Sequence, residues 1–241
     1  MSIFVLSDLH LSTDSATNKS MEVFGARWQG YIPKIEKNWN AVVGDDDTVI
    51  VPGDISWATK LTEAESDLRF LDSLNGKKLI GKGNHDFWWS TATKMNAFFE
   101  EKGFSTLSIL YNNAYIVEDR IICGTRGWFP DEAHQVTVGD VDHAKIVNRE
   151  LTRLSLSLDA ATKLQAEHGA GLPISVFLHF PPVWCDCVME EFVAALKESG
   201  VQECYFGHIH GAYNAPGRFE HDGIKFILTS SDFLSFYPLK I

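Results

Sequence analysis

The sequence opens with the stretch Phe4-Val5-Leu6-Ser7-Asp8-Leu9-His10, in which a short apolar run leads directly into two potential metal ligands. The same pattern recurs in Val49-Ile50-Val51-Pro52-Gly53-Asp54, Leu79-Ile80-Gly81-Lys82-Gly83-Asn84-His85-Asp86, Val176-Phe177-Leu178-His179 and Tyr205-Phe206-Gly207-His208-Ile209-His210. Each apolar run has the length of a buried strand. Because ligands in open α/β sheets collect beyond the carboxyl ends of the strands, we expect these five strand ends to meet in one site.

Spacing within the clusters supports a shared site. Residues i and i+2 of an extended segment point the same way, so Asp8 and His10 can enter one cavity, and so can His208 and His210. A single histidine after a strand is more often a structural residue than a ligand. Five of the nine histidines fall in these clusters, however, and we therefore interpret the clusters together as a metal site.

Helical patterns alternate with the strands, which predicts an α/β fold. Amphipathic helices are expected at 32–42, 61–74, 93–102 and 147–164 and around 192–196, with a Thr62-x-x-Glu65 capping box on the second and caps at Asp140 and Asp142 on the fourth. The runs 107–111, 115–117 and 120–123 indicate neighbouring antiparallel strands, and Asp222-Gly223 indicates a hairpin turn. Since no linker or repeat interrupts the chain, we expect a single domain over residues 1–241.

Composition excludes several classes of protein. The chain has 241 residues, of which 45% are hydrophobic and 22% charged, as in ordinary globular domains. Its net charge is −11, and Lys77-Lys78 is the longest basic run, so long duplex nucleic acid and anionic lipid are not expected partners. No apolar stretch is long enough to span a membrane. With four sparse cysteines and no secretory signal, we expect a cytoplasmic protein.

In order and type, the five clusters resemble the metallophosphoesterases of the calcineurin-like superfamily, from Asp8 to His210. The resemblance implies an α/β fold with two mixed β-sheets packed as a sandwich, helices on both outer faces and the site at the rim. It also implies two metal ions. The implied ligands of the first ion are Asp8, His10, Asp54 and His210, and those of the second are Asp54, Asn84, His179 and His208.

The chemistry of these residue types agrees with that resemblance. Imidazole, carboxylate and amide ligands without thiolate favour divalent transition metals, namely Mn, Fe or Zn. Two such ions lower the pKa of a shared water and stabilise an in-line displacement, so a hydroxide that bridges the ions is the implied nucleophile. By the same resemblance, His85 steadies the phosphate or protonates the leaving oxygen, while Asp86 is expected to brace its loop.

The second motif departs from the family pattern. Protein serine/threonine phosphatases continue Gly-Asp-x-x-Asp-Arg, whereas this chain reads Gly53-Asp54-Ile55-Ser56-Trp57-Ala58. The residue that orients His85 is therefore left open, and protein phosphatase activity is not expected. Trp57 and Arg126 are the candidate substrate residues, for stacking and for binding phosphate respectively. Core packing and a surface ion pair are the alternatives for the two.

The sequence thus predicts an enzyme, a dinuclear metal-dependent phosphoesterase that hydrolyses a small phosphomonoester or phosphodiester. A nuclease-type phosphodiesterase acting on short or single-stranded nucleic acid remains an alternative within the same chemistry. From other classes, a non-catalytic metal-bound scaffold and a redox role for Cys185 and Cys187 remain open.

Overall fold

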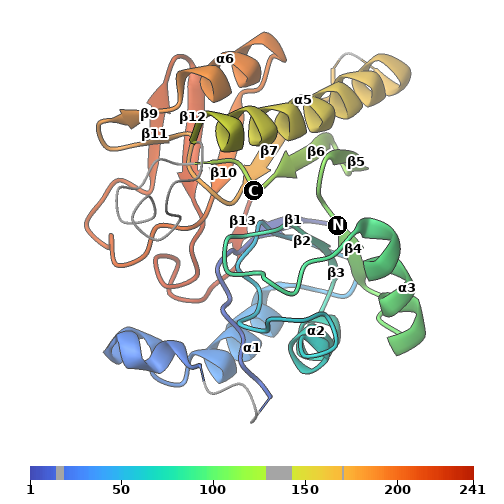
Figure 1. The fold of residues 1–241 in the computed structure, drawn as a ribbon, viewed down its shortest axis with the longest axis vertical. Coiled ribbons are helices and arrows are strands. Elements are labelled where there is room, and N and C mark those ends of the chain that lie inside the picture. Colours follow the sequence, from blue (N-terminus) through green and yellow to red (C-terminus); the bar gives the residue numbers. More distant parts are fainter. Residues whose placement is uncertain (15–18, 129–142, 170) are drawn as a thin grey trace.

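Two mixed β-sheets form the centre of the computed structural model, which describes residues 1–14, 19–128, 143–169 and 171–241 (Figure 1). The strands of the first sheet are, in order, β13 (Leu239–Lys240), β1 (Ile3–Val5), β2 (Thr48–Val51), β3 (Lys77–Ile80) and β4 (Leu107–Ile109). The second contains β11 (Arg218–His221), β12 (Ile224–Leu228), β10 (Glu203–Phe206), β7 (Ile174–Leu178), β6 (Arg120–Thr125) and β5 (Asn113–Val117). Strands β1 to β4 are parallel, as are β12, β10, β7 and β6, and only edge strands run antiparallel.

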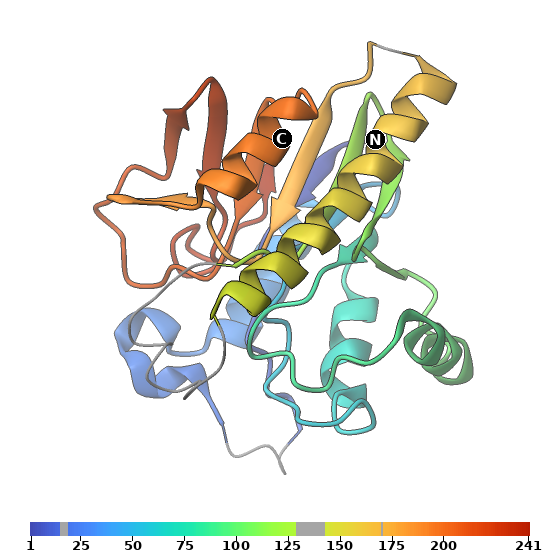
Figure 2. The same cartoon turned by 45° about the horizontal axis from the view of Figure 1, so that its top comes forward.

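Helices cover the outer face of each sheet, which gives four layers. The helices are η1 (Met21–Phe24), η2 (Ala26–Trp28), α1 (Tyr31–Val42), α2 (Glu65–Ser73), α3 (Ala92–Lys102), α5 (His143–His168) and α6 (Glu190–Glu198). In Figure 1, α1 to α3 lie below the first sheet and α5 and α6 above the second. Figure 2 shows α5 running diagonally across the strands that it covers. The fold class predicted from the sequence is confirmed.

Apolar side chains from both sheets meet in the middle of the sandwich. Val5 and Ile50 of the first sheet pack in one buried cluster with Phe177 and Tyr205 of the second. The rings of Phe177 and Tyr205 are stacked, with centroids 4.8 Å apart and planes 8° apart. The alternation of side chains along each strand sends its other apolar residues outward to the helices. Each sheet is therefore buried on both faces, as its continuous apolar strands predict.

Two local predictions are wrong. The run at 107–111 does not neighbour the strands that follow it, because Leu107–Ile109 pairs in parallel with β3 of the first sheet, while β5 and β6 form their hairpin in the second. The capping box at Thr62 is also absent. Helix α2 begins at Glu65 after Ala64, since the Glu63 carboxylate accepts hydrogen bonds from Thr59 and holds the preceding residues in a turn.

Other local predictions agree with the structure. The turn at Asp222-Gly223 joins the antiparallel strands β11 and β12, and both turn residues have the positive φ that such a tight hairpin requires. The predicted caps Asp140 and Asp142 lie outside the described residues. Cys185 and Cys187 carry free thiols in the short hairpin of β8 (Val183–Trp184) and β9 (Cys187–Val188). Within the described ranges, no helix has both the length and the apolar character of a membrane span.

Candidate metal centre

The carboxyl ends of parallel strands from both sheets meet at one end of the sandwich. The chain leaving β1 joins the two sheets there, because the Ser7 amide donates to the Thr229 carbonyl at 3.0 Å beyond β12, while the Asp8 amide donates to the Gly53 carbonyl at 3.0 Å beyond β2. This crossing brings the loops after β1, β2 and β3 against the loops after β7 and β10. The predicted ligands therefore come from both sheets.

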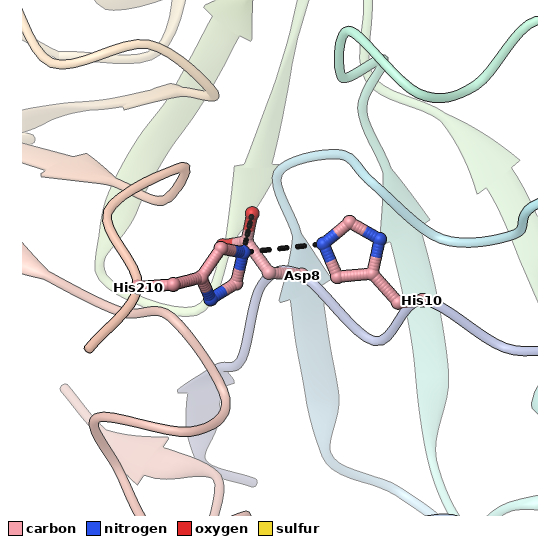
Figure 3. Close-up of side chains that lie close together, drawn as sticks. All are labelled: Asp8, His10 and His210. Carbon is pink, nitrogen blue, oxygen red and sulfur yellow. Dashed lines mark hydrogen bonds and ion pairs between the residues drawn. The ribbon is translucent and has the colours of Figure 1, made fainter. Parts of the chain in front are cut away.

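Asp8, His10 and His210 form a first group whose potential ligand atoms all lie within 4.8 Å of one another. Figure 3 shows Asp8 and His10 on the loop after β1 and His210 approaching from the opposite loop. The Nε2 atoms of His10 and His210 are 3.2 Å apart, and the Asp8 carboxylate lies 3.7 Å from His210 Nε2. One ion would contact all three side chains.

Asp8, Asp54 and His179 form a second such group, which shares Asp8 with the first. Asp54 Oδ2 lies 3.6 Å from His179 Nε2 and also 3.6 Å from His10 Nε2, so this carboxylate stands between the two groups. Asn84 Oδ1 is 2.6 Å from His179 Nε2 and 3.1 Å from His208 Nδ1. The structure thus brings all seven predicted ligands together.

The loops that carry these ligands have an uncommon backbone conformation. Asp8, His10, Asp54 and His208 all have positive φ, between 45° and 69°. Non-glycine residues in this left-handed region are strained, and they concentrate at functional sites. Glycine is required where the loops approach, since a Cβ on Gly83 would lie 2.0 Å from Asp54 Oδ1.

Burial disfavours the charged forms of the carboxylates and imidazoles of this centre. Burial, with the nearby charges of Asp86 and Asp8, raises the pKa of Asp54 well above its ordinary value. Burial likewise raises the pKa of Asp8 and lowers those of His10 and His179. The Nδ1 atoms of both histidines have no hydrogen-bond partner in the described part of the chain. Divalent cations would balance the carboxylates and accept imidazole lone pairs, so this donor set fits the implied metals.

Asp86 organises the loops around the second group. Its buried carboxylate accepts hydrogen bonds from the amides of Asp54, Ile55 and Gly83 at 2.8–2.9 Å. It also accepts from the Ser56 amide and from the indole of Trp88. The expected bracing role of Asp86 therefore extends to two loops, the one after β2 and its own.

His85 lies beside the ligands, and aromatic rings determine its surroundings. The His85 amide donates to Asp54 Oδ1 at 2.8 Å, which ties this residue to the carboxylate between the groups. Its ring centroid is 5.5 Å from that of His10 and 4.5 Å from that of Trp57. Trp57 also stacks on His10, with centroids 4.9 Å apart. An indole thus packs against His85, and it belongs to the residue that stands where the pattern Gly-Asp-x-x-Asp-Arg has its second Asp.

Arg126 follows β6 and is connected to the centre through its main chain. Its carbonyl accepts hydrogen bonds from the amides of His179 and Phe180. Its guanidinium pairs with the buried carboxylate of Glu150 at 2.7 Å, and Arg153 contacts the same carboxylate at 2.6 Å. The side chain is 14% exposed, so its ion pair lies below the surface.

Asp232 also belongs to this cluster, although the sequence motifs do not include it. Its carboxylate lies 2.8 Å from Nδ1 of His210 and accepts the Gly211 amide at 3.0 Å. Burial alone would lower the pKa of His210, but the hydrogen bond to Asp232 and the charges of Asp8 and Asp232 raise it. A signal existed in the sequence, because Thr229-Ser230-Ser231-Asp232 also follows an apolar strand, β12.

One protein family and several solved structures are similar to this chain. The sequence model of the family described as calcineurin-like phosphoesterase matches residues 1–212. A search of curated proteins finds no match. One solved structure with 11% identity has a TM-score of 0.55 and covers 94% of this chain and 89% of its own; at this identity the likeness supports the fold alone.

Two further solved structures have lower TM-scores. A protein of unknown function from Aquifex aeolicus, AQ665, is 17% identical with a TM-score of 0.49, and the match covers 99% of this chain and 95% of that chain. GAP50, the anchor in the inner membrane complex of Plasmodium, is 13% identical with a TM-score of 0.46, over 96% of this chain and 72% of that chain.

Proposed function

The chain belongs to the calcineurin-like phosphoesterase family, and from this premise we propose that it hydrolyses a small phosphomonoester or phosphodiester with two divalent transition-metal ions, Mn, Fe or Zn. The single observation that carries the proposal is the convergence of two groups of potential ligands, Asp8–His10–His210 and Asp8–Asp54–His179, at one end of the sandwich. Both sheets contribute to that convergence, so the arrangement requires the complete fold.

Each ligand has a proposed place. The first ion is assigned to Asp8, His10, Asp54 and His210, and the second to Asp54, Asn84, His179 and His208. The distances of 3.6 Å from Asp54 Oδ2 to both His10 and His179 support a bridging carboxylate. When bound, the ions would supply a bridging hydroxide as nucleophile and hold the phosphate oxygens.

The remaining site residues act on the substrate in this proposal. His85 protonates the leaving oxygen or holds the phosphate, and its main-chain bond to Asp54 keeps it next to the ligands. Trp57 contacts the substrate from its position against His85. Arg126 is the candidate for binding a substrate phosphate, and in the structure its guanidinium pairs with Glu150.

We extend the proposal to the size of the substrate and to the compartment. A net charge of −11 disfavours long duplex nucleic acid, which needs many cations along its path. Tight binding of long duplex DNA at physiological salt would contradict the proposed small substrate.

The four free cysteines are compatible with a reducing cytoplasm, where fractionation of the native host cells should find the protein.

Turnover of bis-p-nitrophenyl phosphate and p-nitrophenyl phosphate tests the proposed activity. Protein stripped with a chelator should be inactive and should regain turnover of at least one ester when Mn²⁺ is restored. The Asp54→Asn variant should stay inactive under the same reloading. Full activity after stripping would refute metal dependence, and a protein that retains Mn²⁺ yet cleaves neither ester would be the metal-bound scaffold instead.

A further inference from the structure

A cavity of about 400 Å³ opens beside the first group of ligands, a volume within the usual range of small-molecule pockets. One side of it is formed by His10, His85 and His210 of the metal centre. The aromatic side chains that line the rest are Phe24, Trp28, Trp57 and Tyr213. We call this cavity the aromatic pocket.

The lining of the aromatic pocket favours a flat, apolar guest. Among the described residues that line it there is no Asp, Glu, Lys or Arg. A polyol placed there would lose hydrogen bonds to water that three imidazoles, two indole N–H groups and one phenol replace only in part, whereas an aromatic ring loses little. Phe24 supports the same conclusion, because this large apolar residue lines the pocket and 68% of its surface is exposed.

Two rings of the aromatic pocket, Trp28 and Tyr213, have packing contacts that restrain them before any ligand arrives. Trp28 is 2% exposed and meets the ring of His210 edge-on, with centroids 5.6 Å apart. The guanidinium of Arg27 lies 4.3 Å from the ring centroid of Tyr213, and the same side chain donates to the hydroxyl of Ser235 at 2.8 Å. A rigid aromatic surface binds a planar group at little cost in conformational entropy.

The position of His85 decides which part of the substrate enters. His85 lines the aromatic pocket, and the first of its two roles in the proposed function is to protonate the leaving oxygen, which places that oxygen beside the pocket. Resting on that function, we propose that the aromatic pocket binds the leaving group of the substrate and that this group carries an aromatic ring. In the reaction, the oxygen of water joins phosphorus, the bond from phosphorus to the ring-bearing oxygen breaks, and that oxygen takes up a proton.

Two esters whose leaving alcohols have similar acidity but different shape test the inference: phenyl phosphate and hexafluoroisopropyl phosphate. With both at saturating Mn²⁺, the phenyl ester should be preferred by about tenfold or more in kcat/KM, a discrimination typical of a hydrophobic pocket. Phe24→Ala should reduce this ratio several-fold, mainly through the KM of the phenyl ester. Phe24 is mostly exposed, so its truncation should not unfold the chain.

A matched control uses a tryptophan in another cavity. Trp184 lines a separate pocket beside β11. The Trp184→Leu variant should therefore keep the wild-type ratio of kcat/KM for the two esters. Equal kcat/KM for the two esters in the wild type, or a ratio unchanged by Phe24→Ala, would overturn the role of the aromatic pocket and leave the phosphoesterase function standing. Failure to cleave any of these esters, both nitrophenyl esters included, would overturn both the pocket's role and the phosphoesterase function.

Discussion

The loop after β3 carries two neighbouring residues with different proposed roles, the metal ligand Asn84 and the substrate-facing His85. Asn84 points its amide oxygen at His179 and His208, whereas the ring of His85 turns toward His10 and Trp57. The chain bends at Asn84 and His85, so the two neighbouring side chains leave this loop in different directions. The roles of the two can therefore be separated by mutation.

His85→Ala should keep both metals and the fold while slowing turnover. If His85 protonates the leaving oxygen, kcat should fall by about 10²–10⁴ for esters with poor leaving groups and by less for nitrophenyl esters. Steady-state kinetics on a series of leaving groups, with metal content measured in parallel, checks this. Equal losses on good and poor leaving groups would reject the proton-donor role. His168→Ala, at the exposed end of α5, is the control.

Asp232 should influence metal affinity although it is not one of the assigned ligands. Its carboxylate fixes the ring of His210 through Nδ1 and leaves Nε2 directed at Asp8 and His10. Partners of this kind usually contribute about 10–100-fold to metal affinity. Asp232→Asn should therefore weaken Mn²⁺ binding by about that factor, measured by competition with a chelating dye.

The control for this variant is Asp222→Asn, in the exposed β11–β12 turn, where asparagine tolerates the same positive φ. It should bind Mn²⁺ like the wild type. Unchanged affinity in Asp232→Asn would show that His210 is oriented without its carboxylate partner.

At the scale of elements, a buried lysine holds the chain between α2 and β3. The Lys78 ammonium is fully buried and donates to the carbonyls of Asp72, Leu74 and Gly76 and to the hydroxyl of Thr106. These carbonyls lie at and beyond the C-terminus of α2, where main-chain acceptors lack helical partners. One cation satisfies them all, at the base of the strand that leads to Asn84 and His85.

Lys78→Met should lower the free energy of unfolding by about 1–3 kcal/mol, because buried carbonyls would lose their donor. Urea denaturation followed by circular dichroism measures the change. Lys77→Met on the same strand has an exposed side chain and should change stability by no more than about 0.5 kcal/mol. A loss no larger than that of the control would mean that water replaces the ammonium.

Many of the strands and turns could be predicted from the sequence, because they follow from local patterns of residues. The runs at 174–178 and 224–228 and the Asp222-Gly223 turn are found as expected. Strand partners are not local information. The apolar run starting at Leu107 suits either sheet, and only the complete fold pairs it with β3. Asp232 could not be predicted from the local pattern alone either, because the residues that follow its strand, 229–232, include no histidine.

At the scale of the whole molecule, both sheets contribute side chains to the proposed metal centre. Asp8, His10, Asp54 and Asn84 follow strands of the first sheet, and His179, His208 and His210 follow strands of the second. Metal binding should therefore link the two halves of the sandwich. In the unfolded chain these ligands are separated by up to some two hundred residues, so the ions bind the folded state in preference.

Metal removal should accordingly lower thermal stability. At a free ion concentration of 100 Kd, one site adds about 2.7 kcal/mol, which corresponds to about 5–10 °C in Tm for a domain of this size. Differential scanning calorimetry with Mn²⁺ and with a chelator measures the shift. The Asp54→Asn variant should show a much smaller shift in Tm. An identical Tm for the wild type in both conditions would contradict the prediction that metal binding links the two sheets.

The number of metal ions per active chain tests the central claim most directly. Mass spectrometry of metals in purified, Mn²⁺-loaded protein, after removal of free ions and with turnover measured on the same sample, should find two ions per chain. Asp54→Asn should lose metal and activity together, because its carboxylate lies 3.6 Å from histidines of both groups. One ion or none in fully active wild-type protein would contradict the account.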